Sequence, residues 1–168
     1  MNKKVHTWLA TYFETTPNYI QEMLKDENAT TYLLVWPVFE QMLFSGFMKK
    51  ADIPTVAQKY APYYQELNIE TSLQHFHNRY QDHNKFRNLQ HNDNFACVSN
   101  ILAQNAANLS DEDKLTFMLY VVYRYRNNIF HGNKGIESWS CYTTQIEMCL
   151  NFMMSILDCA EKHKGEVV

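Results

Sequence analysis

Arg126, Asn127 and His131 are the residues of this chain whose types and spacing could do chemistry together. An imidazole with an ordinary pKa of about 6.5 exchanges a proton near neutral pH, and a guanidinium offers a permanent charge with planar donors. At about 100° per residue, Asn127 and His131 lie one helical turn apart on one face, whereas Arg126 and His131 are roughly 140° apart. Arg126 must therefore curl past the helix end, or face His131 of a second chain, to complete a pocket.

The same residues also have a purely structural explanation. An arginine at a helix end commonly caps backbone carbonyls, and the helix dipole favours a charged histidine near the C-terminus. For an isolated Arg126 and His131 this is the more common situation. The surrounding sequence has to decide between the two explanations.

The helix that carries these residues has a clear start and an apolar body. Ser110 is an N-cap residue, and the three acids that follow it complement the positive end of the helix dipole. From Leu115 to Val122 the residues are apolar on nearly every side, which predicts a helix at the centre of a bundle. No acid stands between Lys114 and Ile136, although the chain has a net charge of −3, so the positive character is local.

The segment from Arg126 to His131 resembles the R-x4-H motif of the HEPN superfamily, and Gly132 follows it. The resemblance implies a single-domain all-α bundle with two long antiparallel central helices. It also implies a homodimer and metal-independent endoribonuclease activity in a toxin–antitoxin or antiviral defence system, with an antitoxin or defence-system protein as a partner. Some such toxins carry a tyrosine two residues after the histidine; Asn133 stands there, so regulation through that tyrosine is not expected.

The resemblance assigns roles that suit the chemistry of these residues. His131 would take the ribose 2′-hydroxyl proton or protonate the leaving 5′-oxygen, and Arg126 would stabilise the charge on the phosphate. Asn127 would bind the phosphate or orient the imidazole, while Arg124 and Lys134 would bind flanking phosphates. Attack by a 2′-hydroxyl requires RNA and excludes DNA. Neither a metal ion nor a cofactor is expected to take part.

Composition bounds the remaining possibilities. A chain of 168 residues suits one domain, taken as 1–168, and four glycines and four prolines favour an all-α fold. The net charge argues against indiscriminate binding to nucleic acids. Four cysteines without C-x-x-C spacing, and the lack of a signal peptide or membrane-length apolar run, predict a cytoplasmic protein with reduced thiols and no membrane contact.

Further helices are predicted along the chain, at Lys3–Glu14, from Pro17 to Leu24, from Tyr32 to Lys49 with a kink at Pro37, from Thr55 to about Leu67, at Phe95–Asn108, and from about Ser138 to Lys162. Glu40 is the lone acid between Glu27 and Asp52. It is expected to reach the surface or form a salt bridge, and the alternative is a carboxylate that orients Arg126 or His131.

A polar helix predicted at Glu70–Leu89 would place His75, Arg79 and His83 in a stripe along one face. If RNA binds, Arg79 and Arg87 are candidates for phosphate contacts, whose energy does not depend on sequence. Nothing in the spacing of the histidines specifies a metal site.

Two other functions stay open at this point. The first is a non-catalytic HEPN-like dimerisation or RNA-binding module, because a scaffold and a nuclease share one hydrophobic pattern. The second is a small-ligand carrier with a Met- and aromatic-rich pocket.

Overall fold

The computed structural model describes residues 3–91, 95–130 and 142–165, and within these ranges every regular element is helical. In chain order the elements are α1 (Lys3–Tyr12), α2 (Pro17–Met23), α3 (Glu27–Phe44), η1 (Lys50–Asp52), α4 (Ile53–Tyr60), η2 (Ala61–Glu66), α5 (Glu70–Tyr80), α6 (His83–Gln90), α7 (Ala96–Leu102), η3 (Ala106–Asn108), α8 (Asp111–Phe130) and α10 (Thr143–Lys162). The expected all-α bundle is therefore confirmed.

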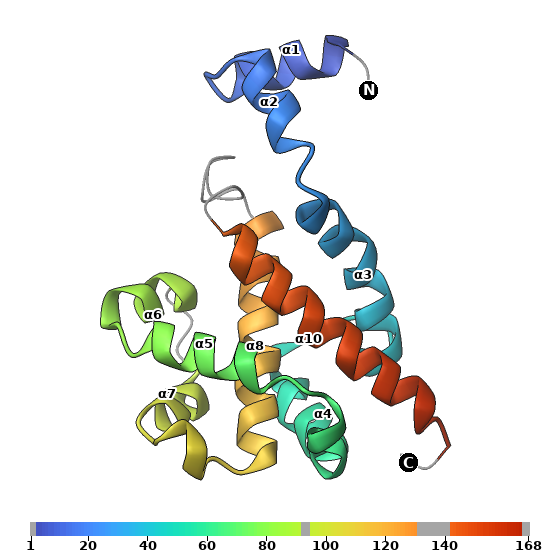
Figure 1. Cartoon of the computed structure of the whole chain (residues 1–168), viewed down its shortest axis with the longest axis vertical. Coiled ribbons are helices and arrows are strands. Elements are labelled where there is room, and N and C mark those ends of the chain that lie inside the picture. Colours follow the sequence, from blue (N-terminus) through green and yellow to red (C-terminus); the bar gives the residue numbers. More distant parts are fainter. Residues whose placement is uncertain (1–2, 92–94, 131–141, 166–168) are drawn as a thin grey trace.

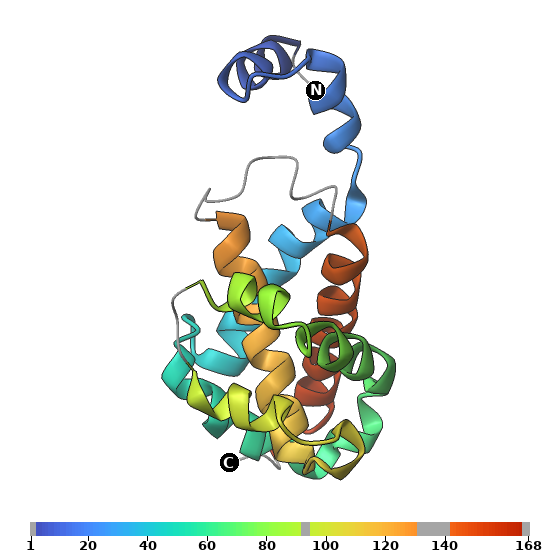
Figure 2. The ribbon, with the colours of Figure 1, turned by 90° about the vertical axis from the view of Figure 1, so that its left-hand side faces the viewer.

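Helix α8 is the centre of the bundle, as its apolar sequence predicts. The Ser110 hydroxyl accepts a hydrogen bond from the Asp113 amide at 3.1 Å and donates one to the Asp113 carboxylate at 2.7 Å, which fixes the start of the helix. All side chains from Leu115 to Val122 are buried. Figures 1 and 2 both show α8 surrounded by α4, α5, α7 and α10. The polar residues at its C-terminal end therefore follow a helical segment that is packed on all sides.

Helix α10 runs antiparallel to α8 and packs most extensively on α3 (Figure 1). Buried apolar side chains from α3 to α10 form one continuous core. Asp26 joins the starts of two of these helices. One carboxylate oxygen accepts from the Asn28 and Ala29 amides at 3.0 and 3.4 Å, and the other accepts from the Thr143 hydroxyl at 3.0 Å. The turn before α3 is therefore fastened to the start of α10.

Helix α3 begins earlier and ends earlier than predicted. The cap at Asp26 starts it at Glu27 rather than at Tyr32, and it continues through Pro37. It ends at Phe44 because Ser45 and Gly46 adopt positive φ angles of 55° and 106°, after which the Gly46 amide donates to the Glu40 carbonyl at 3.0 Å. The predicted extension to Lys49 is therefore wrong.

The single helix predicted at Glu70–Leu89 is two helices. Asp82 accepts from the Asn84 and Lys85 amides at 2.9 and 3.2 Å and so caps a new helix, α6. This break separates His83 from the face that carries His75 and Arg79, so the predicted three-residue stripe is wrong.

The remaining boundaries agree more closely with the sequence. The predicted Thr55–Leu67 helix is α4 followed by η2, with the change just before Pro62, and the predicted Phe95–Asn108 helix is the shorter α7 followed by η3. None of the helices in the described ranges combines the length and the apolar character needed to cross a membrane.

Helices α1 and α2 form a hairpin, here called the arm (residues 3–23). They pack chiefly on each other, and the arm extends beyond the end of the bundle, as Figures 1 and 2 show from two directions. Its buried side chains are only His6, Ala10 and Ile20. The arm therefore has almost no core of its own.

Candidate functional site

Arg126 and Asn127 lie at the C-terminal end of α8, where the guanidinium of Arg126 is held on two sides. Its Nη1 donates to the Asn127 side-chain oxygen at 3.1 Å, and its Cζ lies 5.6 Å from the centre of the Trp36 ring. Trp36 is 4% exposed, so the ring is a fixed platform, and cation–π contacts of this geometry stabilise an arginine. The positive charge is thus oriented while the side chain stays half-buried.

Tyr32 lies beside the same guanidinium, one turn before Trp36 on α3. Its hydroxyl donates to the Val122 carbonyl at 3.0 Å. Burial raises the pKa of Tyr32 well above its ordinary value, although the nearby Arg126 charge acts in the opposite direction. Tyr32 therefore remains a neutral donor that ties α3 to α8 directly below Arg126.

His131 and Lys134, like Gly132, lie outside the described residues. Arg126 and Asn127, the fifth and fourth residues before His131 in the sequence, are the described part of the motif.

Arg124 lies two residues before Arg126 but points into the protein. It is 6% exposed, and its Nε donates to the Leu89 carbonyl at 2.8 Å. That carbonyl belongs to the last turn of α6, so Arg124 connects α6 to α8. The structure thus gives this predicted phosphate ligand a buried structural contact.

Arg79 lies in a second cluster, made by α5, α8 and α10. Its Cζ is 5.8 Å from the centre of the Tyr142 ring, which packs edge-on against Tyr125. The Tyr80 hydroxyl donates to the Tyr125 hydroxyl at 3.1 Å, and burial raises the pKa of both tyrosines, so both stay protonated near neutral pH. Tyr142 is the first described residue after His131 in the sequence, so Arg79 contacts the residue at which the described chain resumes.

His75 belongs to the same cluster. Its Nε2 lies 3.4 Å from the Gln145 amide nitrogen, and burial, with the Arg79 charge, lowers the pKa of His75. A neutral His75 can accept a hydrogen bond from Gln145, provided that the proton sits on Nδ1.

Arg87 and Glu40 are separate from both clusters. Arg87 is exposed on α6 and donates to the Asn84 side chain at 3.2 Å. The Glu40 carboxylate accepts from the Met48 amide at 3.1 Å, so it braces the turn after α3. A hydrogen bond to a backbone amide is a structural contact, and it differs from the salt bridge that the sequence suggested for Glu40.

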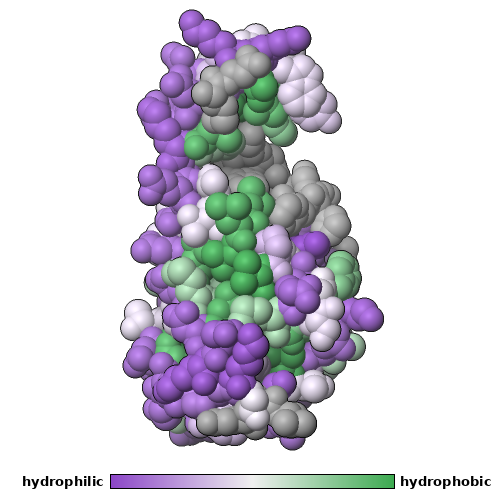
Figure 3. All heavy atoms as spheres, turned by 90° about the vertical axis from the view of Figure 1, so that its right-hand side faces the viewer, coloured by the Kyte–Doolittle hydropathy of each residue, from purple (hydrophilic) through white to green (hydrophobic). Residues whose placement is uncertain are grey.

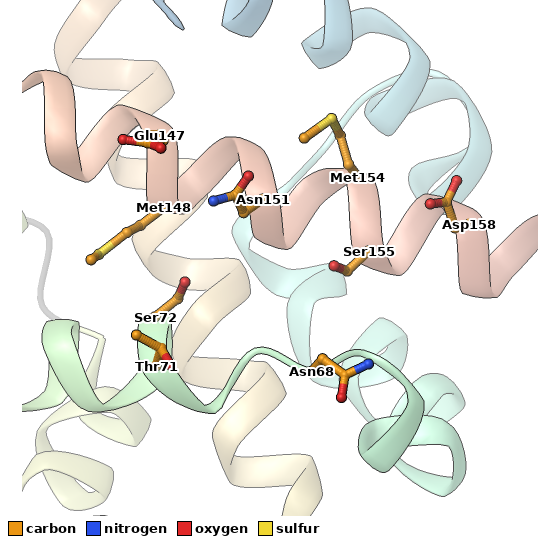
Figure 4. Close-up of a pocket in the computed structure, with 9 residues that line it drawn as sticks. All are labelled: Asn68, Thr71, Ser72, Glu147, Met148, Asn151, Met154, Ser155 and Asp158. Atoms are coloured by element: carbon orange, nitrogen blue, oxygen red, sulfur yellow. The ribbon is translucent and has the colours of Figure 1, made fainter.

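A groove of about 590 Å³ lies between α10 and the start of α5, and Figure 4 shows side chains of α10 facing those before and on α5. Its lining is largely polar and includes two acids: Asn68, Thr71, Ser72, Glu147, Met148, Asn151, Met154, Ser155 and Asp158. Acidic side chains repel phosphates, and an apolar ligand needs an apolar lining. The groove therefore suits neither RNA nor the carrier function. Within the described ranges, no three His, Cys, Asp or Glu side chains gather in a way that could hold a metal ion.

Sequence reasoning missed Tyr32 and Trp36 as neighbours of Arg126. They are about 90 residues away in the chain, and their spacing is that of ordinary core residues, so no local signal marks them. The arrangement they build can hold an anion against a fixed positive charge.

No protein-family model matches this chain, and neither a curated protein nor a solved structure is similar enough to count as a match.

Proposed function

We propose that this protein is a metal-independent endoribonuclease in which Arg126, Asn127 and His131 of two chains act at one cleft. The observation that carries the proposal is the Arg126 guanidinium, which is oriented by the Trp36 ring and the Asn127 side chain. Arg126 stands five residues before His131 in the sequence. A guanidinium in such a position suits a phosphate, because its donors match the planar spread of phosphate oxygens.

In the proposed reaction the ribose 2′-oxygen attacks the adjacent phosphorus and the bond from phosphorus to the 5′-oxygen breaks. One His131 accepts the 2′-hydroxyl proton, and the other donates a proton to the leaving 5′-oxygen. Arg126 stabilises the negative charge on the non-bridging oxygens. The products are a 2′,3′-cyclic phosphate and a 5′-hydroxyl. Each chain has a single histidine in the motif, so the acid and the base require two chains.

Basic residues would bind the phosphates that flank the cut. Arg79 suits this role because its guanidinium lies over the Tyr142 ring just before α10. Lys134, three residues after His131 in the sequence, and the exposed Arg87 are the other candidates. Arg124 suits it least, since its guanidinium is buried against the Leu89 carbonyl. We therefore assign Arg124 to structural support of the site. An antitoxin or another defence-system protein remains the proposed partner, and the cytoplasm the proposed location.

The proposal is tested by incubating single-stranded RNA with the purified protein in EDTA, beside His131→Ala and Arg126→Ala. Lys59→Ala is the matched control, because it removes an exposed positive charge on α4 that has no role in the proposal. We expect cleavage by the wild type and the control, and loss of cleavage in the two motif variants. Equal cleavage by all four proteins, or cleavage only after a divalent metal is added, would reject the mechanism.

A second candidate is a dimerisation or RNA-binding module that does not cut. The exposed apolar surface of α3, described below, favours it, because such a surface serves assembly rather than chemistry. The two functions differ in whether Arg126 and His131 of two subunits approach within about 10 Å of one open cleft, the reach needed to span one phosphodiester.

A further inference from the structure

Helix α3 is apolar on both its inner and its outer side. Its inner residues Tyr32, Trp36 and Phe39 belong to the core, while Leu34, Val38 and Met42, spaced four residues apart, are exposed on the opposite side. We call this outer stripe, together with Leu33, the α3 face. A helix that is hydrophobic all round is expected to be buried on all sides. Figure 3 shows the apolar surface over this side of the molecule. The bundle alone leaves the α3 face uncovered.

The arm carries a second uncovered apolar stripe. Val5, Trp8 and Tyr12 recur at helical spacing on α1, and Trp8 and Tyr12 are 62% and 71% exposed and stacked on each other with ring centres 5.6 Å apart. We call these three residues the arm face. Figure 3 also shows apolar surface on the arm, beyond the end of the bundle.

The arm needs a partner surface to be stable. Its two helices have 10 and 7 residues, and isolated helices shorter than about 12–15 residues are marginal in water. The arm buries only three side chains. Asp26 fastens the turn that follows the arm to Thr143 at the start of α10.

We propose that the arm face of one chain packs on the α3 face of a second copy, and that the second copy returns the same contact. Each chain carries both faces, and a two-fold pairing that uses each of them once is closed and self-complementary. This pairing goes beyond the proposed activity, which requires two chains but not these surfaces.

The available area fits a stable pair. The exposed surface of Trp8 and Tyr12 is about 200–350 Å² together. With the aliphatic residues of the two faces, the exposed apolar surface is on the order of 500 Å² per chain. Two chains together reach the roughly 1,000 Å² at which specific interfaces begin, before any polar rim is counted.

A membrane surface is a weaker occupant. Helices that lie on membranes combine an apolar face with an excess of lysine and arginine. From residue 3 to residue 23 the arm has two lysines and two acids, so it lacks that excess. The charge balance thus favours a protein surface, and the self-complementary faces favour a second copy.

The pairing is tested by measuring the mass of the full chain in solution by light scattering. The wild type should have twice the mass of one chain. Trp8→Glu and Val38→Lys should each weaken dimerisation by about tenfold or more, because a charge is placed in an apolar contact. Both side chains are substantially exposed in the single chain, so the fold should survive, which circular dichroism checks. Ala96→Glu is the matched control, since it adds a charge at an exposed site on α7, on the other side of the bundle in Figure 1.

Mixing Trp8→Glu with Val38→Lys separates this pairing from others. In the mixed dimer both substitutions fall in the same arm–α3 contact, where their opposite charges can pair, and the other contact is wild type. Mixing should therefore restore the doubled mass.

A monomeric wild type, a dimer unaffected by either substitution, or no restoration on mixing would overturn the proposal. So would a monomer that sediments with anionic lipid vesicles through Trp8. A dimer that cuts no RNA would refute only the proposed activity, whereas a dimer that cuts RNA but is unaffected by either substitution would refute only the pairing.

Discussion

The guanidinium of Arg126 lies over the ring of Trp36, with 5.6 Å between Cζ and the ring centre, although the two residues come from helices far apart in the sequence. The contact joins the polar end of α8 to the core side of α3. It gives Arg126 a fixed direction, and such pre-orientation is what a phosphate-binding residue needs.

Substitution Arg126→Lys tests that orientation. Lysine keeps the charge but loses the planar donor set and the flat contact with Trp36. We expect RNA cleavage to fall by about tenfold or more, while the free energy of unfolding changes by less than about 1 kcal/mol. The measurement pairs cleavage rates with urea unfolding. Lys59→Arg, at an exposed site on α4, should change neither quantity, and full activity in Arg126→Lys would show that charge alone suffices.

Arg124 should behave in the opposite way. Arg124→Met leaves the Leu89 carbonyl without the buried, charge-assisted hydrogen bond it now accepts. We expect a loss of about 2 kcal/mol in the free energy of unfolding. Urea unfolding measures it, with Arg87→Met as the exposed control. An unchanged midpoint would mean that the contact between α6 and α8 contributes nothing to stability.

The pair Tyr80 and Tyr125 predicts loss of stability in alkali. Burial raises the pKa of both hydroxyls, so the folded state keeps its protons at a pH where the unfolded state loses them. Their contribution is complete below about pH 10, the ordinary tyrosine value, and is lost as the pH rises through the raised pKa values. The variant with Phe at both positions should lose stability less steeply above that pH. Tyr12→Phe, at an exposed site, should leave the slope unchanged, and identical slopes in all three proteins would contradict the argument.

His75 predicts a weaker effect in acid. Because burial lowers its pKa, the unfolded state takes up a proton that the folded state refuses, so the contribution is complete above about pH 6.5 and is lost as the pH falls through the lowered pKa. The unfolding free energy falls with pH in acid, and His75→Gln should make this slope shallower by at most the amount that corresponds to about one bound proton. His83→Gln, at an exposed site on α6, is the control. An equal change in both variants would count against a special role for His75.

The sequence predicted the fold best where one signal was strong. The Ser110 cap and the unbroken apolar run after it identified α8 as the central helix, because only full burial accommodates such a run. Short polar breaks were harder. Asp26 and Asp82 each cap a helix, but both stand in polar stretches without glycine or proline, so α3 was started too late and α5 was joined to α6.

The candidate site was predictable only in part. The sequence placed the adjacent residues Arg126 and Asn127 near the end of the predicted central helix, and in the structure their side chains form a hydrogen bond. The burial of Arg124 and the platform at Trp36 depend on tertiary contacts with Leu89 and α3 that no local pattern contains. Arg124 and Arg126 are two residues apart, so the helix places them on different faces and in different environments.

The most direct test of the central claim uses a DNA oligonucleotide with one internal ribonucleotide, incubated with the protein in EDTA. The account predicts a single cut on the 3′ side of the ribonucleotide, with a 2′,3′-cyclic phosphate and a 5′-hydroxyl as the new ends, and no cut by His131→Ala. Cleavage of the same oligonucleotide without its ribonucleotide, or a 3′-hydroxyl end formed only with added metal, would contradict it.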